Sequence, residues 1–112
     1  MANDELGLIQ GTLDFLVLKT LSGGQKHGFE IARSIQQATE EVLRVEEGTL
    51  YPALHRLARR RLIAGAWGIS DRGRRAKFYR LTASGQRALE HEARDWSRFV
   101  AAVDRVVKAA ES

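Results

Sequence analysis

The side chains best suited to chemistry in this sequence are basic, and they are concentrated in its middle third. From Arg44 to Arg80 there are ten lysines and arginines but three acidic residues. The first 43 residues carry three basic and six acidic groups, and residues 81–112 carry five of each. A patch of this kind is typical of a protein that binds a polyanion, although a solvated basic surface has the same composition.

Residue types that serve catalysis or metal binding form no recognisable set. The chain has no cysteine, which excludes disulfides, thiolate zinc sites and a cysteine nucleophile. The histidines, His27, His55 and His91, lack metal-ligand spacing, and no Ser-His-Asp combination stands out. The glycines near Gly23 lack the Gly-Lys-Ser/Thr ending of a phosphate-binding loop. We therefore expect no enzymatic activity, no cofactor and no metal.

The basic segment contains "EGTLYPALHRLARR", which predicts a short helix with one apolar face. Thr49 suits the N-cap, which makes Leu50 the first helical residue and Pro52 the third. Proline is tolerated there, because the first amides of a helix have no acceptor within it. The apolar positions recur at steps of three and four: Leu50, Ala53, Leu54 and Leu57.

The other faces of this helix carry side chains that can contact DNA. They are Tyr51, Pro52, His55, Arg56, Arg59 and Arg60. Such groups can bond base edges and phosphates in the major groove. An ordinary solvated surface would also carry them, and for His55 the two interpretations are equally compatible with the sequence.

A β-hairpin is predicted next. The segments "IAGAWGI", residues 63–69, and "AKFYRLT", residues 76–82, alternate like strands, and "SDRGRR" between them has turn chemistry. The tip carries Arg72, Arg74 and Arg75, with Lys77 just behind, a concentration of charge that an anion would neutralise. Trp67, inside the first strand, is expected in the core.

Two helices are expected before the basic segment. Residues 12–22 are apolar on most faces, which favours a buried helix. A second helix should run from near His27 to about Thr39. His27 is expected to be a packing or capping residue at its start. The helix should bury Phe29, Ile31, Ala32 and Ile35. Residues 42–45 could form a very short strand. This order predicts a mainly α fold with a small β-hairpin, a winged helix-turn-helix whose third helix enters the major groove.

The last segment predicts one long helix. Its apolar positions step alternately by four and three over roughly three heptads: Leu89, Ala93, Trp96, Val100, Val103, Val107 and Ala110, widened by Phe99 and Val106. A core built from residues 1–82 is too small to cover this stripe, so we expect a DNA-binding domain, 1–82, and a dimerisation helix, 83–112. A helix folded back onto its own domain is the alternative. A homodimer would suit an inverted repeat in DNA.

Membrane association is not expected. No apolar run approaches the ~20 residues of a membrane span. The N-terminal Met-Ala-Asn-Asp-Glu is acidic where a signal peptide is basic. These features predict a cytoplasmic protein.

Three stretches resemble the PadR family of bacterial transcriptional regulators: "LIQGTLDFLVLKTLSGGQKHGFEIARSI", "VEEGTLYPALHRLARR" and "WGISDRGRRAKFYRLTASGQRALE". The resemblance runs from about Leu8 to Trp96, and the single C-terminal helix is similar to the smaller of the family's two subgroups. It implies a dimeric repressor of near-palindromic operators. It assigns the major groove to Thr49, Tyr51, Pro52, His55 and Arg56, and the wing to Arg74, Arg75 and Lys77. Some members release DNA on binding a flat aromatic compound at the dimer interface, where Trp96 is similar to their stacking tryptophan.

The sequence departs from the family pattern at two places. Arg61 stands where relatives usually have glycine, which adopts a left-handed helix cap without steric penalty. We therefore expect an altered helix end and an altered direction for Arg59 and Arg60. Asp71-Arg72 replaces Glu-Asn at the wing tip. Two other functions remain open from the residues alone, a protein-interaction module that does not bind DNA and a protein that sequesters small aromatic ligands.

Overall fold

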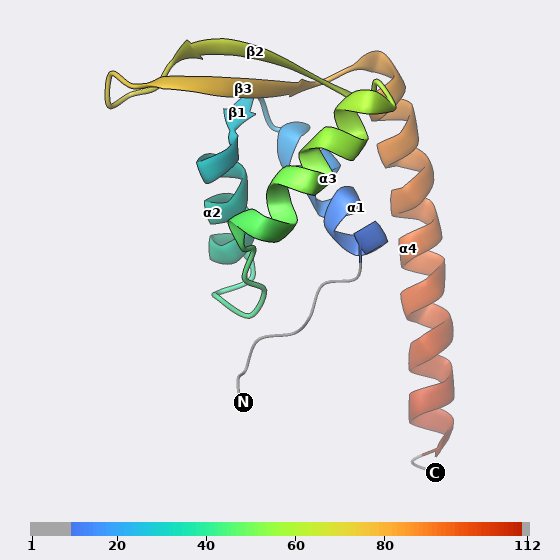
Figure 1. Ribbon diagram of the computed structural model, residues 1–112. Helices are drawn as coiled ribbons and strands as arrows, with labels where there is room; N and C mark the ends of the chain where they lie inside the picture. Colours follow the sequence, from blue (N-terminus) through green and yellow to red (C-terminus); the bar gives the residue numbers. More distant parts are fainter. Residues whose placement is uncertain (1–9, 111–112) are drawn as a thin grey trace.

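The computed structural model describes residues 10–110, which form four helices and a three-stranded antiparallel sheet (Figure 1). Along the chain these are α1 (Gln10–Leu21), β1 (Lys26–His27), α2 (Gly28–Ala38), α3 (Glu47–Arg59), β2 (Ile63–Ile69), β3 (Arg75–Leu81) and α4 (Ala83–Ala110). This arrangement confirms the predicted fold class. The resemblance to the PadR family begins at Leu8, the first predicted domain begins at residue 1, and the second ends at residue 112. These three positions lie outside the described residues.

The sheet has the order β1-β3-β2, so β3 is its central strand. The hairpin of β2 and β3 was predicted, and its register pairs Gly65 with Tyr79 and Trp67 with Lys77. Strand β1 was not predicted, because two residues are too short to show an alternating pattern. Its His27 pairs with Phe78.

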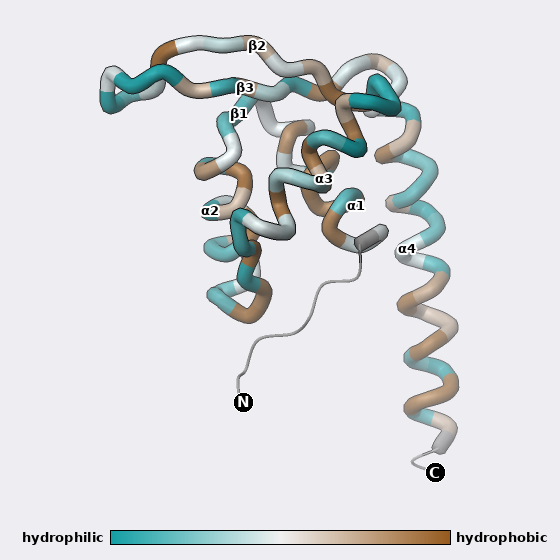
Figure 2. Tube along the Cα trace, viewed as in Figure 1, coloured by the Kyte–Doolittle hydropathy of each residue, from teal (hydrophilic) through white to brown (hydrophobic). Residues whose placement is uncertain are grey.

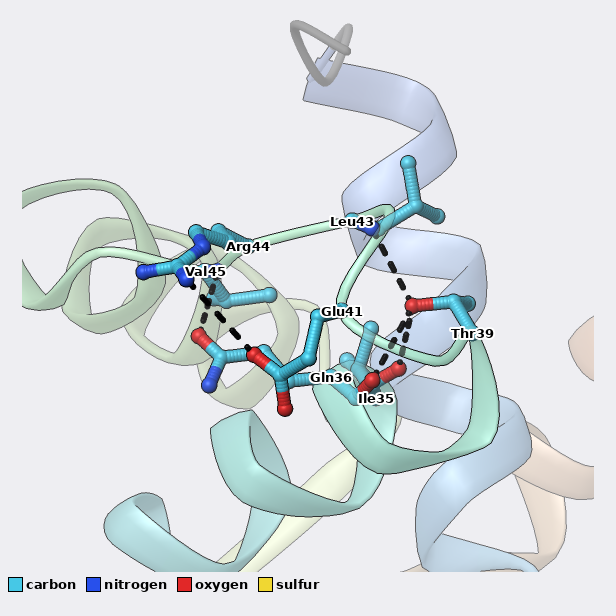
Figure 3. Close-up of polar contacts among 7 residues, drawn as sticks. All are labelled: Ile35, Gln36, Thr39, Glu41, Leu43, Arg44 and Val45. Atoms are coloured by element: carbon cyan, nitrogen blue, oxygen red, sulfur yellow. Dashed lines mark hydrogen bonds and ion pairs between the residues drawn. The ribbon is translucent and has the colours of Figure 1, made fainter. Parts of the chain in front are cut away.

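The short strand predicted at residues 42–45 is wrong, because this segment is part of the loop between α2 and α3 (Figure 3). Its amides bond to side chains of the preceding helix end: Leu43 N–H donates to Thr39 Oγ1 at 3.1 Å, and Val45 N–H donates to Gln36 Oε1 at 3.2 Å. Polar side chains thus satisfy these amides where a neighbouring strand would otherwise do so.

The core lies between the helices and the base of the hairpin. It contains Leu13, Val17, Leu18, Leu21, Ile31, Ile35, Val45, Leu50, Ala53, Leu54, Leu57, Leu62, Ile63, Tyr79 and Leu89. Two predicted core residues are instead exposed: Phe29 by 63% and Trp67 by 59%. Phe29 lies on the outer side of α2, whose buried side carries Ile31 and Ile35, and Trp67 lies where the hairpin extends beyond the helices.

Helix α3 begins earlier than predicted. Its N-cap is Glu46, which makes no side-chain cap bond, and the amide of Leu50 already donates to the Glu46 carbonyl at 2.8 Å. Thr49 is therefore inside the helix, and Pro52 is its sixth residue. Proline lacks the N–H that would bond the Gly48 carbonyl. Gly48 and Pro52 are both exposed, so water can satisfy that carbonyl.

Helix α3 ends in a left-handed residue, although that residue is arginine. Arg61 has φ 63°, its amide donates to Ala58 O at 2.9 Å, and the Leu62 amide donates to Leu57 O at 3.0 Å. These two bonds define a Schellman cap, and the accompanying apolar pair, Leu57 and Leu62, is buried. The expectation that arginine would alter the helix end is wrong, because this bonding and packing outweigh the left-handed penalty of about 1–2 kcal/mol.

Helix α4 starts against the core and then leaves it (Figure 1). A Cβ on Gly85 would lie 2.0 Å from the Leu62 carbonyl oxygen, so only glycine permits this contact. Leu89 is 4% exposed within its own chain, so its prediction as a dimer-interface residue is corrected to a core role. The C-terminal half of α4 extends beyond the other elements, and Figure 2 shows apolar segments along it.

Replacement of Arg61 by glycine should stabilise the fold. Glycine adopts the observed φ without the steric penalty, so we expect Arg61→Gly to raise the free energy of unfolding by about 1 kcal/mol. Urea unfolding at matched protein concentration measures the change. Arg60→Gly is the control, because Arg60 has φ −81° and glycine there should be neutral or destabilising. Equal stability of Arg61→Gly and the wild type would contradict a steric penalty for arginine at this position.

Candidate nucleic-acid interface

Helix α3 separates its apolar residues from a polar, exposed face. Leu50, Ala53, Leu54 and Leu57 are each at most 1% exposed. The exposed residues are Glu47, Gly48, Thr49, Tyr51, Pro52, His55 and Arg59. The predicted contact residues Thr49, Tyr51, Pro52, His55 and Arg59 are thus all accessible on one helix.

Arg56 differs from these residues, because an acidic side chain of α1 holds it. Its Nη2 lies 2.9 Å from Asp14 Oδ1 and its Nε lies 3.5 Å from Asp14 Oδ2. The side chains of Arg56 and Asp14 are 31% and 13% exposed. A two-point bond of this kind fixes the guanidinium plane and ties α3 to α1. The pair is separated by 42 positions, so sequence periodicity gave no signal for it.

Tyr51 lies on the opposite flank of α3, against α2 and the sheet. A Cβ built on Gly28 would lie 2.9 Å from the Tyr51 hydroxyl, so glycine makes room for the ring. Burial raises the pKa of the Tyr79 phenol above its ordinary value, and the nearby Tyr51 raises it further. Tyr51 is still 42% exposed, so it links the helix face to the sheet and also remains accessible.

The turn of the hairpin is built by Ser70 and Gly73. The Ser70 amide donates to Arg74 O at 2.7 Å, the Gly73 amide donates to Ser70 O at 2.8 Å, and Gly73 has φ 75°. The turn leaves Asp71, Arg72 and Arg74 exposed at the tip. The predicted cluster of arginines at the end of the hairpin is therefore present.

Two further cations of the hairpin rest on aromatic rings. The Arg75 guanidinium carbon lies 4.3 Å from the centre of the Trp67 ring. Lys77 Nζ lies 5.8 Å from the centre of the Tyr79 ring. Such contacts restrict flexible side chains while leaving their charge available to an anion.

Helix α2 connects α3 to the hairpin tip along the surface. A groove of about 740 Å³ lies between α2 and the start of α3, and one of about 430 Å³ lies between α2 and the hairpin tip. Phe29 and Arg33 line both grooves. The surface is therefore continuous from α3, over α2, to Arg72 and Arg74.

The other singled-out residues have structural roles or solvent exposure. His27 caps α2: its Nδ1 accepts from the Glu30 amide at 3.4 Å, and its own amide donates to Glu30 Oε1 at 3.1 Å, as a capping box does. His91 lies exposed, 3.3 Å from Asp95. Across residues 10–110 no group of three acidic, histidine or cysteine side chains could hold a metal, and no helix there is long and apolar enough to cross a membrane.

Trp96 lies where α4 passes α1. Its ring centre is 6.2 Å from that of Phe15 and 6.0 Å from that of Phe99, beside a cavity of about 290 Å³. Four residues of the predicted apolar stripe follow Trp96 and are between 37% and 60% exposed: Phe99, Val100, Val103 and Val107. Ala93, which precedes Trp96, is half-buried. The apolar stripe of α4 is thus not covered by any other element among residues 10–110.

Known proteins share both the sequence and the fold of this chain. The model of the transcriptional regulator PadR-like family matches residues 17–91. An uncharacterized protein of Lysinibacillus sphaericus is 30% identical over 105 residues, 93% of this chain and 95% of that protein.

Solved structures of transcription regulators superpose closely on it. One from Clostridium thermocellum has a TM-score of 0.78 and 28% identity, covering 87% of this chain and 94% of that one. A PadR family regulator from Clostridium difficile has a TM-score of 0.69 and 33% identity, covering 81% of this chain and 92% of that one. Both of these structures are of transcriptional regulators, and this chain shares their fold. The chain belongs to the PadR-like family of DNA-binding transcriptional regulators.

Proposed function

We propose that the protein is a homodimeric repressor that binds a near-palindromic operator through α3 and the hairpin wing. The observation that carries this proposal is the continuous surface from the exposed face of α3 to the arginines of the wing tip. In a winged helix, the third helix enters the major groove and the wing follows the adjacent backbone. The strong basic surplus of residues 44–80, which include both elements, supports binding of a polyanion.

The side chains of the two elements serve different parts of the DNA in this proposal. His55, Tyr51 and Arg59, with Thr49 and Pro52 beside them, face the base edges. Arg74, Arg75 and Lys77 neutralise phosphates. Arg56 keeps its bond to Asp14 and sets the orientation of α3, with the exposed part of its side chain near the DNA.

Dimerisation through α4 follows from the uncovered apolar stripe. A helix of 28 residues is about 42 Å long, and within the described residues its side chains from Val100 to Ala109 are all exposed. A second copy would cover Trp96, Val100, Val103 and Val107 and would place two α3 helices on successive turns of the duplex.

A flat aromatic compound is the proposed effector. The cavity beside Trp96 is lined by Phe15 and Phe99, and aromatic walls favour a planar apolar ligand. Release of DNA on ligand binding would make the protein a ligand-controlled repressor, located in the cytoplasm with the genome. Ligand binding without any change in the DNA complex would instead indicate sequestration.

The wing and the helix should respond differently to mutation. Arg74→Ala should weaken binding to all duplexes and lower the slope of log affinity against log salt by about one, because one phosphate contact is lost. His55→Ala should leave that slope unchanged and reduce the preference for the operator over random DNA. Fluorescence anisotropy at several salt concentrations, with the DNA upstream of the gene and a shuffled duplex, measures both. No binding of the wild type to either duplex would refute the function.

The bond between α1 and α3 should contribute to both stability and recognition. Asp14→Asn weakens the pairing with Arg56, so we expect the free energy of unfolding to fall by about 1 kcal/mol. The preference for the operator over random DNA should fall as well, because α3 is then held less firmly against α1. Lys19→Ala, an exposed site on the same helix, is the control. If Asp14→Asn lowers stability but leaves the preference for the operator unchanged, the Asp14–Arg56 bond contributes to folding and not to recognition.

A charge within the stripe of α4 should separate the dimer. Val103→Asp would bury a carboxylate without a partner at the interface, and we expect dimerisation to weaken by about a hundredfold or more. Analytical ultracentrifugation measures the mass, and circular dichroism checks that the chain remains folded. Ala101→Asp is the matched control, because it lies on a different face of the same exposed helix segment. A wild-type monomer would contradict the proposed assembly.

A further inference from the structure

One face of the hairpin continues from the core out to solvent. The register places Ile63, Tyr79, Trp67 and Ile69 on the same face, together with Gly65, Leu81, Lys77 and Arg75. At the base Ile63 and Tyr79 are 2% and 5% exposed, whereas further out Trp67 and Ile69 are 59% and 67% exposed. The outer half of this face, formed by Trp67, Ile69, Arg75 and Lys77, is called the wing face below.

The wing face combines apolar surface with positive charge in fixed positions. Arg75 lies over the Trp67 ring at 4.3 Å. Lys77 crosses the strand at Gly65, since a Cβ there would lie 2.7 Å from Lys77 Cε, and its ammonium reaches the Tyr79 ring. Arg75 is therefore held beside the exposed Trp67 ring, and Lys77 is held beside the buried Tyr79 ring.

An exposed tryptophan and isoleucine require a partner that also accepts cations. Burial of such side chains is favourable, and this fold does not gain that free energy by itself. The backbone of duplex DNA offers both surfaces, because apolar deoxyribose faces alternate with phosphates. The wing face continues toward the core at Gly65, where an added Cβ would lie 3.1 Å from the Tyr79 ring.

We propose that Trp67 is a DNA-contact residue of the wing, packing on deoxyribose while Arg75 and Lys77 bind the flanking phosphates. Arg75 and Lys77 are two residues apart on one strand, so their side chains emerge about 6.6 Å apart on the same side. Trp67 lies opposite Lys77, and the Arg75 guanidinium lies over one face of its ring. This inference rests on the proposed binding of DNA by α3 and the wing, and it adds an uncharged contact that does not depend on base sequence.

The test uses fluorescence in a background with a single tryptophan. The chain contains only Trp67 and Trp96, so Trp96→Phe leaves Trp67 as the reporter. A random-sequence duplex about three helical turns long is the probe, because the proposed contact reads no bases. We expect the duplex to reduce quenching of Trp67 by acrylamide. Binding of the same duplex, followed by anisotropy of a label on the DNA, shows separately whether the protein binds DNA at all.

Affinity then distinguishes a contact from a merely structural role. Trp67→Ala should weaken binding about tenfold and leave the salt slope unchanged, because no charge is removed. If Trp67 served only to hold Arg75, Trp67→Ala would lower the slope of log affinity against log salt as Arg75→Ala does. DNA would then leave the acrylamide quenching of Trp67 unchanged. Either result would overturn the proposal. Unaltered affinity of Trp67→Ala in a protein that binds the duplex would overturn it as well.

Matched charge variants locate the contact on one face of the sheet. Arg75→Ala and Arg80→Ala each remove one exposed arginine from β3, but Arg80 pairs with Ala64 on the other face. We expect a lower salt slope for Arg75→Ala and a much smaller change for Arg80→Ala. Equal effects of the two variants would place the contact elsewhere and overturn the assignment. Loss of binding in the wild type would instead be a failure of the proposed function.

Discussion

The corner at Arg61 and Leu62 joins α3, the hairpin and α4, the elements of the proposed DNA-binding dimer. Only three residues separate α3 from β2, and the Schellman cap fixes their path. The Thr82 hydroxyl lies 2.8 Å from the Arg61 carbonyl oxygen and 3.0 Å from that of Leu62, and it accepts the Gly85 amide at 3.0 Å. One threonine thus binds the end of α3 to the start of α4, and the Gly85 contact closes the same corner.

This corner makes the relative placement of helix, wing and α4 a property of short covalent links and the hydrogen bonds of Thr82. Leu57, Leu62 and Ile63 are buried on either side of it, so a rotation of α3 would also disturb the base of the hairpin. The Asp14–Arg56 bond adds a second fixed point in the last turn of α3. In the proposed dimer, the separation of two reading helices would follow from how two α4 helices pack, because little freedom remains between α4 and α3.

The features predicted correctly from the sequence are those encoded by local pattern. The hairpin follows from alternation and from the turn residues Ser70 and Gly73, and the start of α2 follows from His27 beside Gly28. The errors arise where distant contacts decide. Thr49 is a good N-cap, but α3 begins at Glu47, because the backbone amides of Thr49 and Leu50 already bond to the Glu46 carbonyl. The bond between Asp14 and Arg56 joins residues far apart in the chain, which no periodicity reveals.

Wrong assignments of burial have a common physical cause. Trp67, Phe29 and Leu89 were placed from residue type and period alone, which identify an apolar face but not what covers it. Leu89 is buried in the core of its own chain, while Trp67 stays 59% exposed on the hairpin.

The large apolar side chains that stay exposed in the described part of the chain are concentrated on functional surfaces. Val103 and Val107 continue the α4 stripe, Trp67 and Ile69 form the wing face, and Phe29 lies between α3 and the wing tip. Contiguous exposed apolar surface is unfavourable for an isolated soluble chain and commonly marks a binding site. Because these residues do not add to the core, their exposure is best explained by partners, a second copy along α4 and DNA along the wing.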